Sequence, residues 1–515
     1  MRYTEAIHPN TTHLDQMDAS HLLASLQHAE LEVFHNDWGA GLWDAHFLKD
    51  LNRLQKQIRE TLAHPKGKVV ISGAGTSGRL ALQTALTSHY NQDRQRVFGL
   101  LAGGPGAFFR AKEGVEDSPQ AGIRDLEALP LPEGPSVLIG ITCGLSAAYV
   151  AGTIHAAMAA NYDAIAVLGF NPAEAANRRP LPGLDDDFHG LLTRLANRQG
   201  GYLLLPIVGP EPLTGSTRMK GGTASKIVLD LCLGKVGIET GLGHCQRVLE
   251  ATLAQEFQLV PILEKASHSL LHGGALVYLT CGRPGLMTLL DASECPPTFG
   301  AAPDQVIALI DPPLADSFSD LGLANSLWTS ATIKNRTGST IIGFTSTHHD
   351  SAEFVEAIRN FSAARTPLSS KAAKALGAAP AEMRSGLLDL ILKRNLNALS
   401  TGAFVLAGKV WRNIMIDLSI SNLKLFHRAC RIISQITGRG EDAAWLALAQ
   451  TILQTEDKPV MMEPEKLLPL AANRKKLVPI TALRLGAGQS ASEAGMVLKQ
   501  HPKVKDALKW AMELA

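Results

Sequence analysis

The stretch Ile71-Ser-Gly-Ala-Gly-Thr-Ser-Gly-Arg-Leu80 decides the fold of this chain. It continues the apolar residues Val69 and Val70, and it therefore reads as the end of a buried strand that turns into a helix. The turn between them can be tight because three of its residues have no side chain: Gly73, Gly75 and Gly78. Thr76 and Ser77 place two hydroxyl groups at the expected helix N-terminus, where backbone N–H groups and the helix dipole favour an anion.

The kind of anion follows from what surrounds these glycines. The stretch lacks the Gly-Lys-Ser/Thr ending of a nucleotide P-loop, and hydroxyls in place of a lysine favour a sugar phosphate. The glycines do satisfy G-x-G-x-x-G, but a dinucleotide site also needs an acidic residue after the next strand. That strand runs into Ala102-Gly-Gly-Pro105 without a carboxylate. A purely structural strand-to-helix turn stays open as the alternative.

Composition excludes several classes of protein. The chain has 515 residues, 45% of them hydrophobic and 19% charged, with a net charge of +1. This balance is typical of a globular protein with large cores, and it argues against nucleic acid or an anionic membrane as the main partner. The six cysteines form no C-x-x-C pair, residues 1–18 carry no apolar signal core, and no apolar run is long enough to span a membrane. We expect a cytoplasmic protein without a metal or organic cofactor.

Residues from about 13 to 62 have helical spacing, and short apolar runs then alternate with helical stretches. The expected strands are Lys68–Ser72, Val97–Ala102, Ser136–Ile141, Ala164–Gly169 and Tyr202–Ile207. This alternation predicts a parallel sheet covered by helices on both faces, with ligands at the carboxyl ends of its strands. Polar loops follow three of the strands, at Gly73–Gly78, Thr142–Ser146 and Gly209–Thr217.

The pattern restarts after a helical stretch from about 219 to 272. Strands of a second sheet are expected at Ala275–Thr280, Val306–Ile310 and Ser339–Thr345. Ala372–Ala379 reads as a small-residue connector closed by Pro380, and the chain reads helical from about 382 onward. Thr280–Gly285 can be laid over Gly73–Gly78 as an internal repeat, but it has lost the Thr-Ser hydroxyls and gained Pro284. We therefore expect one good phosphate site, in the first domain.

Several motifs resemble the N-acetylmuramic acid 6-phosphate etherases. They are Gly73–Arg79, Glu113–Asp117, Gly215–Thr223, Asp291–Gly300, and Ser400-Thr-Gly402 with Gly408-Lys409, Asn413, Met415, Asp417, Asn422 and Lys424. Those proteins carry one sugar isomerase (SIS) domain per chain, whereas this chain has two. It therefore resembles the glucokinase regulatory protein family more closely, with Gly144–Ala147, Gly169–Pro172, Arg218–Gly222 and Ser421–Phe426 as its versions of that family's motifs.

The resemblance implies an α/β fold with two flavodoxin-like, parallel-sheet SIS domains in tandem and a C-terminal helical lid. The expected boundaries are 1–62 for N-terminal helices, 63–250 for the first SIS domain, 251–410 for the second and 411–515 for the lid.

The two halves depart from the etherase pattern in complementary ways. Thr87 stands where the etherases have a catalytic glutamate after the first glycine-rich loop, and Glu294 fills that place in the second half. The motif that contains Glu116 occurs only in the first half. This suggests a fused pseudo-dimer in which the first phosphate loop, Glu116 and Glu294 meet in one composite cleft.

By resemblance, Glu116 is the base and Glu294 the acid of an etherase. The expected residues of the phosphate and substrate site are Gly75, Thr76, Ser77, Gly144, Ser146, Ser216, Thr217, Lys220 and Lys409. For a lone serine, a helix N-cap would be the simpler interpretation, but three hydroxyl-rich loops after strands favour a ligand. For the two glutamates, a solvated or helix-start carboxylate is the simpler interpretation, and only the family motif makes them catalytic candidates.

Three functions remain open at this point. The sequence favours a carbon–oxygen lyase that removes D-lactate from N-acetylmuramic acid 6-phosphate and leaves N-acetylglucosamine 6-phosphate. The alternative is a regulator without catalytic activity that senses a fructose phosphate and inhibits a glucokinase or hexokinase partner. An aldose–ketose isomerase ranks last, because its usual helix-borne base motif is not evident.

Overall fold

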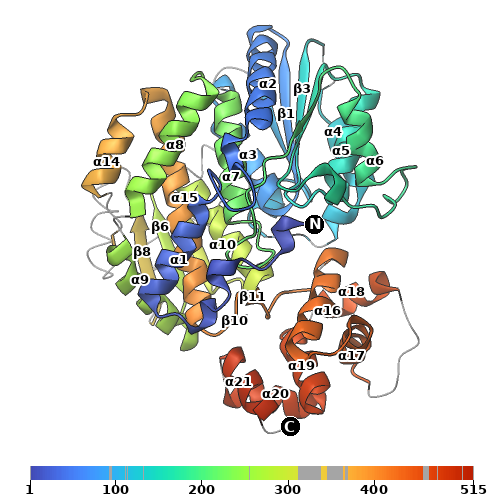
Figure 1. Cartoon of the computed structure of the whole chain (residues 1–515), viewed down its shortest axis with the longest axis vertical. Helices are drawn as coiled ribbons and strands as arrows, with labels where there is room; N and C mark the ends of the chain where they lie inside the picture. The colour runs from blue at the N-terminus through green and yellow to red at the C-terminus, as the bar shows by residue number, and fades with distance from the viewer. Residues whose placement is uncertain are drawn as a thin grey trace.

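The computed structural model describes residues 2–91, 95–110, 112, 114–130, 133–253, 256–310, 338–344, 364–365, 369–420, 422–455, 463–472, 474–501 and 503–513. Two α/β halves lie side by side, and a helical lid follows them at the C-terminal end of the chain (Figure 1). The predicted fold class is confirmed: two parallel sheets in tandem precede a helical lid.

The first half holds a parallel sheet in the order β2-β1-β3-β4-β5. Its strands are β1 (Lys68–Gly73), β2 (Val97–Leu101), β3 (Ser136–Ile141), β4 (Ala164–Leu168) and β5 (Gly201–Leu204). Val69 and Ile71 face one core and Val70 faces another, because successive strand residues point to opposite faces. Both faces are thus buried, which explains why the strands read as continuous apolar runs.

Helices cover both faces of this sheet. The elements before it are η1 (Tyr3–Glu5), η2 (Pro9–Thr11), η3 (Leu14–Gln16), α1 (Ala19–Leu31), η4 (Gly41–Trp43) and α2 (Ala45–Ala63). The helices within and after it are α3 (Gly75–Leu86), η5 (His89–Asn91), η6 (Pro105–Phe108), η7 (Val115–Asp117), α4 (Pro119–Glu127), α5 (Ala148–Ala159), η8 (Ala173–Ala175), α6 (Phe188–Ala196), α7 (Lys220–Leu233), α8 (Ile238–Thr252) and α9 (Glu256–Leu271). Helices α4, α5 and α6 share one core with the sheet, and α2, α3 and α7 share the other.

The second half repeats this plan with the strand order β7-β6-β8-β9, again parallel. Its elements are β6 (Leu276–Thr280), α10 (Gly285–Phe299), β7 (Val306–Ile310), β8 (Thr340–Phe344), β9 (Ala364–Arg365), α14 (Ser370–Gly377) and α15 (Ala381–Leu406). Strand β6 occupies the place that β1 has in the first sheet, so the β6–α10 loop corresponds to the β1–α3 loop. Helices α3 and α10 pack against each other across the two halves.

The lid begins with a short antiparallel ladder, formed by its first two strands. Its elements are β10 (Val410–Trp411), β11 (Ile414–Met415), α16 (Leu423–Thr437), α17 (Glu441–Leu453), α18 (Pro464–Ala472), α19 (Leu477–Ala487), α20 (Ala491–Gln500) and α21 (Val504–Glu513). The N-terminal segment lies between the lid and the first half (Figure 1), where Glu5 Oε1 accepts a hydrogen bond from Arg428 Nη2 at 2.6 Å. Thr11 Oγ1 donates to Pro212 O at 2.8 Å.

The strands lie where the sequence predicts them, to within a few residues, although Thr345 lies outside the described residues. Two sequence interpretations are wrong. Residues 372–379 are not a connector, since α14 covers most of them: Ser369 caps that helix, and its alanine, lysine and leucine residues favour helix. The chain is not purely helical after 382 either, because β10 and β11 interrupt it.

The proline pair in the second half lies inside a helix. Prolines usually end regular structure, but α10 continues through Pro296-Pro297 to Phe299. Two prolines near a helix C-terminus remove only two N–H donors, and Gly300, with φ of 61°, supplies the stop. Asp291 and Glu294 consequently lie well inside a helix, not at its start.

Candidate functional site

The β1–α3 turn is built by contact between its own glycines. A Cβ on Gly73 would lie 2.5 Å from the Gly78 nitrogen, and one on Gly78 would lie 2.4 Å from the Gly73 oxygen. Gly75 has a φ of +55°, which side chains other than glycine rarely adopt. Among the described residues, the backbone N–H groups of Gly75, Thr76 and Ser77 have no protein acceptor. The turn therefore presents three free donors at the N-terminus of α3, as an anion site requires.

A second loop carries Ser146 toward the same place. Thr142 Oγ1 accepts hydrogen bonds from the backbone nitrogens of Ser146 and Ala147 at 3.2 and 3.3 Å, which shapes the turn after β3. Ser77 Oγ lies 3.7 Å from Cys143 Sγ, so the first two loops touch. The carboxyl ends of β1 and β3 are adjacent because the strands pair in the sheet.

Two neighbouring cavities open beside these loops. The first cavity has a volume of about 170 Å³, and its walls include Gly75, Thr76, Ser77, Arg79, Glu116, Ser216, Thr217, Arg218, Glu294, Asn422 and Arg428. The second cavity has a volume of about 630 Å³, and its walls include Ser77, Glu116, Gly144, Ser146, Arg179, Thr217, His427 and Arg431. The two share Ala74, Ser77, Glu116 and Thr217. Residues of both α/β halves and of the lid thus surround one continuous region.

The two glutamates both line the first cavity, and each has a partner on another part of the chain. Glu116 Oε1 accepts a hydrogen bond from Asn422 Nδ2 at 2.7 Å, at the start of the lid helix α16. Glu294, on α10 of the second half, is in an ion pair with the buried Arg79 of α3 in the first half. Arg79 Nε also donates to Phe108 O at 3.2 Å, which fixes the guanidinium.

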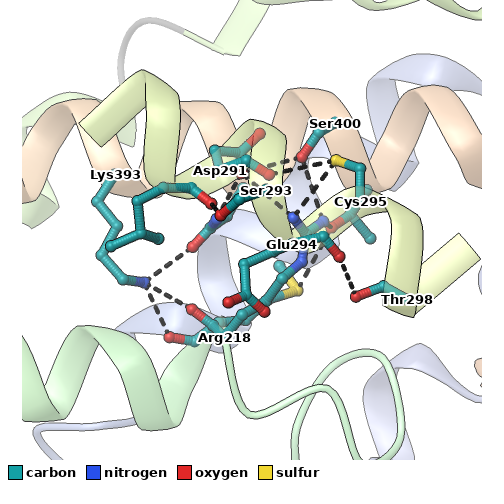
Figure 2. A network of polar contacts seen from close by, with 12 residues as sticks. Arg218, Asp291, Ser293, Glu294, Cys295, Thr298, Lys393 and Ser400 are labelled. Carbon is teal, nitrogen blue, oxygen red and sulfur yellow. Dashed lines mark hydrogen bonds and ion pairs between the residues drawn. The ribbon is translucent and has the colours of Figure 1, made fainter. Parts of the chain in front are cut away.

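Behind Glu294 lies a buried polar network centred on Arg218 and Asp291 (Figure 2). Arg218 Nη1 lies 3.2 Å from Asp291 Oδ1, and Arg218 Nη2 is 2.6 Å from Thr401 Oγ1. Asp291 also accepts hydrogen bonds from Tyr278 and Asn397 at 2.8 and 2.7 Å. With its acceptors filled by the protein, Asp291 is a structural group that positions the α10 segment carrying Glu294.

Lys393 of α15 completes this network (Figure 2). Its ammonium donates to the backbone oxygen of Arg218 at 2.8 Å and to Asn397 Oδ1 at 2.8 Å. Burial lowers the pKa of Lys393. At Arg218 burial acts in the same direction and is the largest single effect, but Asp291, Cys295, Glu294 and Tyr278 together outweigh it, so the pKa of this guanidinium lies above its usual value. Through its hydrogen bond to the Arg218 backbone oxygen, Lys393 holds the segment that begins with Ser216 and Thr217 in place.

Gly215 shows why that segment is close to the lid. Its φ is +74°, and a Cβ there would lie 2.6 Å from the Arg428 guanidinium carbon. Glycine at this position lets Arg428 of α16 reach the first cavity while remaining bonded to Glu5.

Most of the residues singled out from sequence come together. Gly75, Thr76, Ser77, Glu116, Ser216, Thr217 and Glu294 line the first cavity, and Gly144 and Ser146 line the second. Two lysines do not join them. Lys220 Nζ is fully buried and lies 2.6 Å from Glu32 Oε2, and the Lys409 ammonium pairs with Asp417. Neither lysine is among the residues that line the two cavities.

Sequence reasoning missed several basic residues of this region, among them Lys393, Arg428 and, as the partner of Glu294, Arg79. Lys393 and Arg428 lie in ordinary helical patterns and Arg79 ends the glycine-rich motif, but each meets its partner only through long-range packing. Within the described residues, no group of three or more His, Cys, Asp or Glu side chains is placed to hold a metal ion, and no helix has the length and apolar character to cross a membrane.

Comparison with known proteins relates both ends of the chain to one family. Residues 53–158 match the description "Glucokinase regulatory protein N-terminal SIS domain", and residues 412–508 match "C-terminal lid domain of glucokinase regulatory protein". The chain is 28% identical to the glucokinase regulatory protein of Xenopus laevis, over 94% of this chain and 88% of that protein. It is 27% identical to the Homo sapiens protein of that name, over 99% and 92%. It is 32% identical to the N-acetylmuramic acid 6-phosphate etherase of Pasteurella multocida, over 46% of this chain and 70% of that protein.

Proposed function

Because the chain belongs to the SIS-domain superfamily, in the group that includes glucokinase regulatory proteins and N-acetylmuramic acid 6-phosphate etherases, we propose that it is a sugar-phosphate-sensing regulator of a sugar kinase. The sequence alone favoured the etherase. The relatives that span both halves and the lid support the regulator instead, whereas the etherase match covers less than half of this chain.

The phosphate group is assigned to the free N–H groups of Gly75–Ser77 and to the hydroxyls of Ser77, Ser146 and Thr217. These donors belong to three loops that line the joined cavities, and helix α3 adds its positive end. The sugar hydroxyls then face Glu116 and Glu294. Carboxylates accept hydrogen bonds from hydroxyl groups, so these residues fit binding without turnover.

The ion pair between Arg79 and Glu294 supports binding without turnover. An etherase needs a base that removes the proton at C2 of the open-chain sugar and an acid that protonates the departing ether oxygen at C3. The acid must hold a proton to give away. Glu294 is instead the acceptor of a charged hydrogen bond from a buried guanidinium, which suits a fixed carboxylate.

The etherase stays the second candidate because Glu116 and Glu294 line one cavity. One experiment separates the two. Purified protein is given N-acetylmuramic acid 6-phosphate, and D-lactate release is measured; binding of fructose 6-phosphate and inhibition of a glucokinase-type enzyme are measured in parallel. We expect no lactate, saturable fructose 6-phosphate binding, and inhibition that changes with this ligand. Lactate release that is lost in Glu116→Gln and Glu294→Gln would establish the etherase instead.

A further inference from the structure

A third cavity lies at the other ends of α3 and α10, and no function has been assigned to it above. Its volume is about 670 Å³. Its walls are Thr84, Leu86, Thr87, Ser88, His89, Asp230, Leu233, Gly234, Lys235, Cys245, Arg283, Glu382, Met383, Ser385, Gly386, Leu387 and Leu390.

This cavity is built from the same three kinds of segment as the first cavity. The first is lined by the β1–α3 loop, by residues 215–218 before α7, and by the end of α10 with Glu294. The third is lined by Arg283 of the β6–α10 loop, by Glu382, Met383, Ser385 and Gly386 at the start of α15, and by the end of α3 with Thr87. In each α/β half, the loop between the first strand and the following helix lines one cavity. The C-terminal end of that helix lines the other cavity. The two cavities are pseudo-equivalent, as expected of a fused pair of SIS domains.

The chemistry at the third cavity differs from that at the first. Arg283 replaces the Thr-Ser hydroxyls of the phosphate loop. Its Nε and Nη2 are 3.0 and 2.7 Å from Asp389 Oδ2, which holds the guanidinium in place, and Nη1 has no partner among the described residues. Asp389 also accepts from Gln83 Nε2 of α3 at 3.1 Å. Arg283 is therefore a fixed donor with one exposed edge, the geometry that suits a phosphate oxygen.

Two further basic groups lie near one another in this cavity. Lys235 is exposed and has no ion pair among the described residues, and burial together with the Lys235 ammonium lowers the pKa of His89. Of the two acids in the wall, Asp230 is bound by Lys226 Nζ at 2.5 Å, and Glu382 lies in the first turn of α15. Thr87 and Ser88 add hydroxyl groups beside His89.

We propose that this third cavity is a second ligand site, which takes a small phosphate-bearing metabolite on Arg283, Lys235 and His89. The cavity is larger than an inorganic ion requires, so the organic part of the ligand lies against the hydroxyls of Thr84 and Thr87 and the apolar side chains of Met383 and Leu387. The site is separate from the sugar-phosphate site of the proposed function. The two sites lie at opposite ends of helices α3 and α10, which pack against each other.

The test uses one histidine in each region as a reporter. His89 lines the third cavity and His427 lines the second, and their imidazole NMR resonances are assigned with His89→Gln and His427→Gln. Inorganic phosphate is the probe. We expect a saturable shift of the His89 resonance that persists in Ser77→Ala. Lys235→Ala should weaken that response about tenfold, since one charge-assisted hydrogen bond is lost.

The controls separate a local site from a general effect. Lys371→Ala removes an exposed lysine of α14 outside all three cavities and should leave the His89 response unchanged. Because the Lys235 side chain is exposed, its removal should not disturb folding. Arg283→Lys is a second variant, which keeps the positive charge beside Asp389 but replaces the planar guanidinium and its N–H donors by a single ammonium group. The proposal fails if the His89 resonance does not shift at phosphate concentrations that saturate the shift of the His427 resonance. It also fails if Lys235→Ala titrates like the native chain, or if the His89 response disappears in Ser77→Ala.

Discussion

Glu116 Oε1 accepts a hydrogen bond from Asn422 Nδ2 at 2.7 Å, and this contact joins the first α/β half to the start of the lid. Asn422 also caps α16, since its Oδ1 accepts from Leu425 N at 2.8 Å. Beside it, Asp117 Oδ2 accepts from Leu423 N at 3.3 Å. The lid helix is therefore held at its N-terminus by two acidic residues that belong to the wall of the cavities.

Asn422→Asp should loosen this attachment without removing the cap. The substitution keeps the capping oxygen but replaces the amide donor with a charge that repels Glu116. We expect faster amide hydrogen exchange in the first turns of α16, by about tenfold for each 1.4 kcal/mol lost. Adding Glu116→Gln should slow exchange again, because the glutamine amide can donate to the carboxylate introduced on the lid. Equal exchange in the native chain and in Asn422→Asp would contradict the role of this contact.

Ser77→Ala should weaken the binding of fructose 6-phosphate by about one to two orders of magnitude. Ser77 lines both cavities of the proposed site, and a hydrogen bond to a charged phosphate contributes about 1.5–3 kcal/mol. Titration calorimetry measures the dissociation constant. Ser20→Ala is a matched control, since Ser20 is exposed on α1 and lines no cavity described above. If both variants bind as the native chain does, the phosphate is held elsewhere.

Local patterns in the sequence predict the frame of this site, because strand, turn and helix depend on near neighbours. The apolar run 69–71 and the glycines after it are enough to place the β1–α3 turn and its free N–H groups. The complementary loss at Thr87 and gain of Glu294 point to a cleft between the halves. The structure brings Glu116 and Glu294 to one cavity.

Charge pairing could not be predicted in the same way. Lys220 and Lys409 lie within motifs that suggest a ligand, but their ammonium groups are bound to Glu32 and Asp417. Glu32 is 188 residues from Lys220 in the sequence, so no local pattern relates them. Arg79 ends the glycine-rich motif in the sequence, but only the packing of α3 on α10 shows that it neutralises Glu294.

The stability of the chain should fall as the pH rises through the neutral range. Glu211 accepts hydrogen bonds from Lys220 N and Gly221 N, both at 2.8 Å; burial, with the nearby charge of Glu30, raises its pKa from 4.5 to about 8. Between these values the folded chain holds a proton that the unfolded chain has lost. The stabilisation that this proton provides is complete below pH 4.5. It is lost as the pH rises toward 8, and the free energy of unfolding falls by up to about 1.4 kcal/mol per pH unit.

Glu30→Gln tests this pH dependence. Both carboxylate oxygens of Glu30 are buried without a hydrogen-bond partner among the described residues, so an uncharged glutamine of equal size removes a repulsion without breaking a hydrogen bond of those oxygens. We expect a smaller loss of unfolding free energy between pH 5 and pH 8, measured by urea denaturation across that range. An unchanged slope would show that Glu30 does not act on Glu211.

The ion pair between Arg79 and Glu294 should stabilise the contact between the two halves only as a complete pair. Glu294→Ala leaves Arg79, whose side chain is only 2% exposed, without its acid, and we expect the free energy of unfolding, measured by urea denaturation, to fall by about 3 kcal/mol. Replacing both residues by methionine should recover much of this loss, because two apolar side chains of similar size need no counter-charge. Glu174→Ala, at an exposed position in η8, is the control and should change little. If the double variant were as unstable as Glu294→Ala, shape or the hydrogen bond to Phe108, and not the unpaired charge, would be the cause.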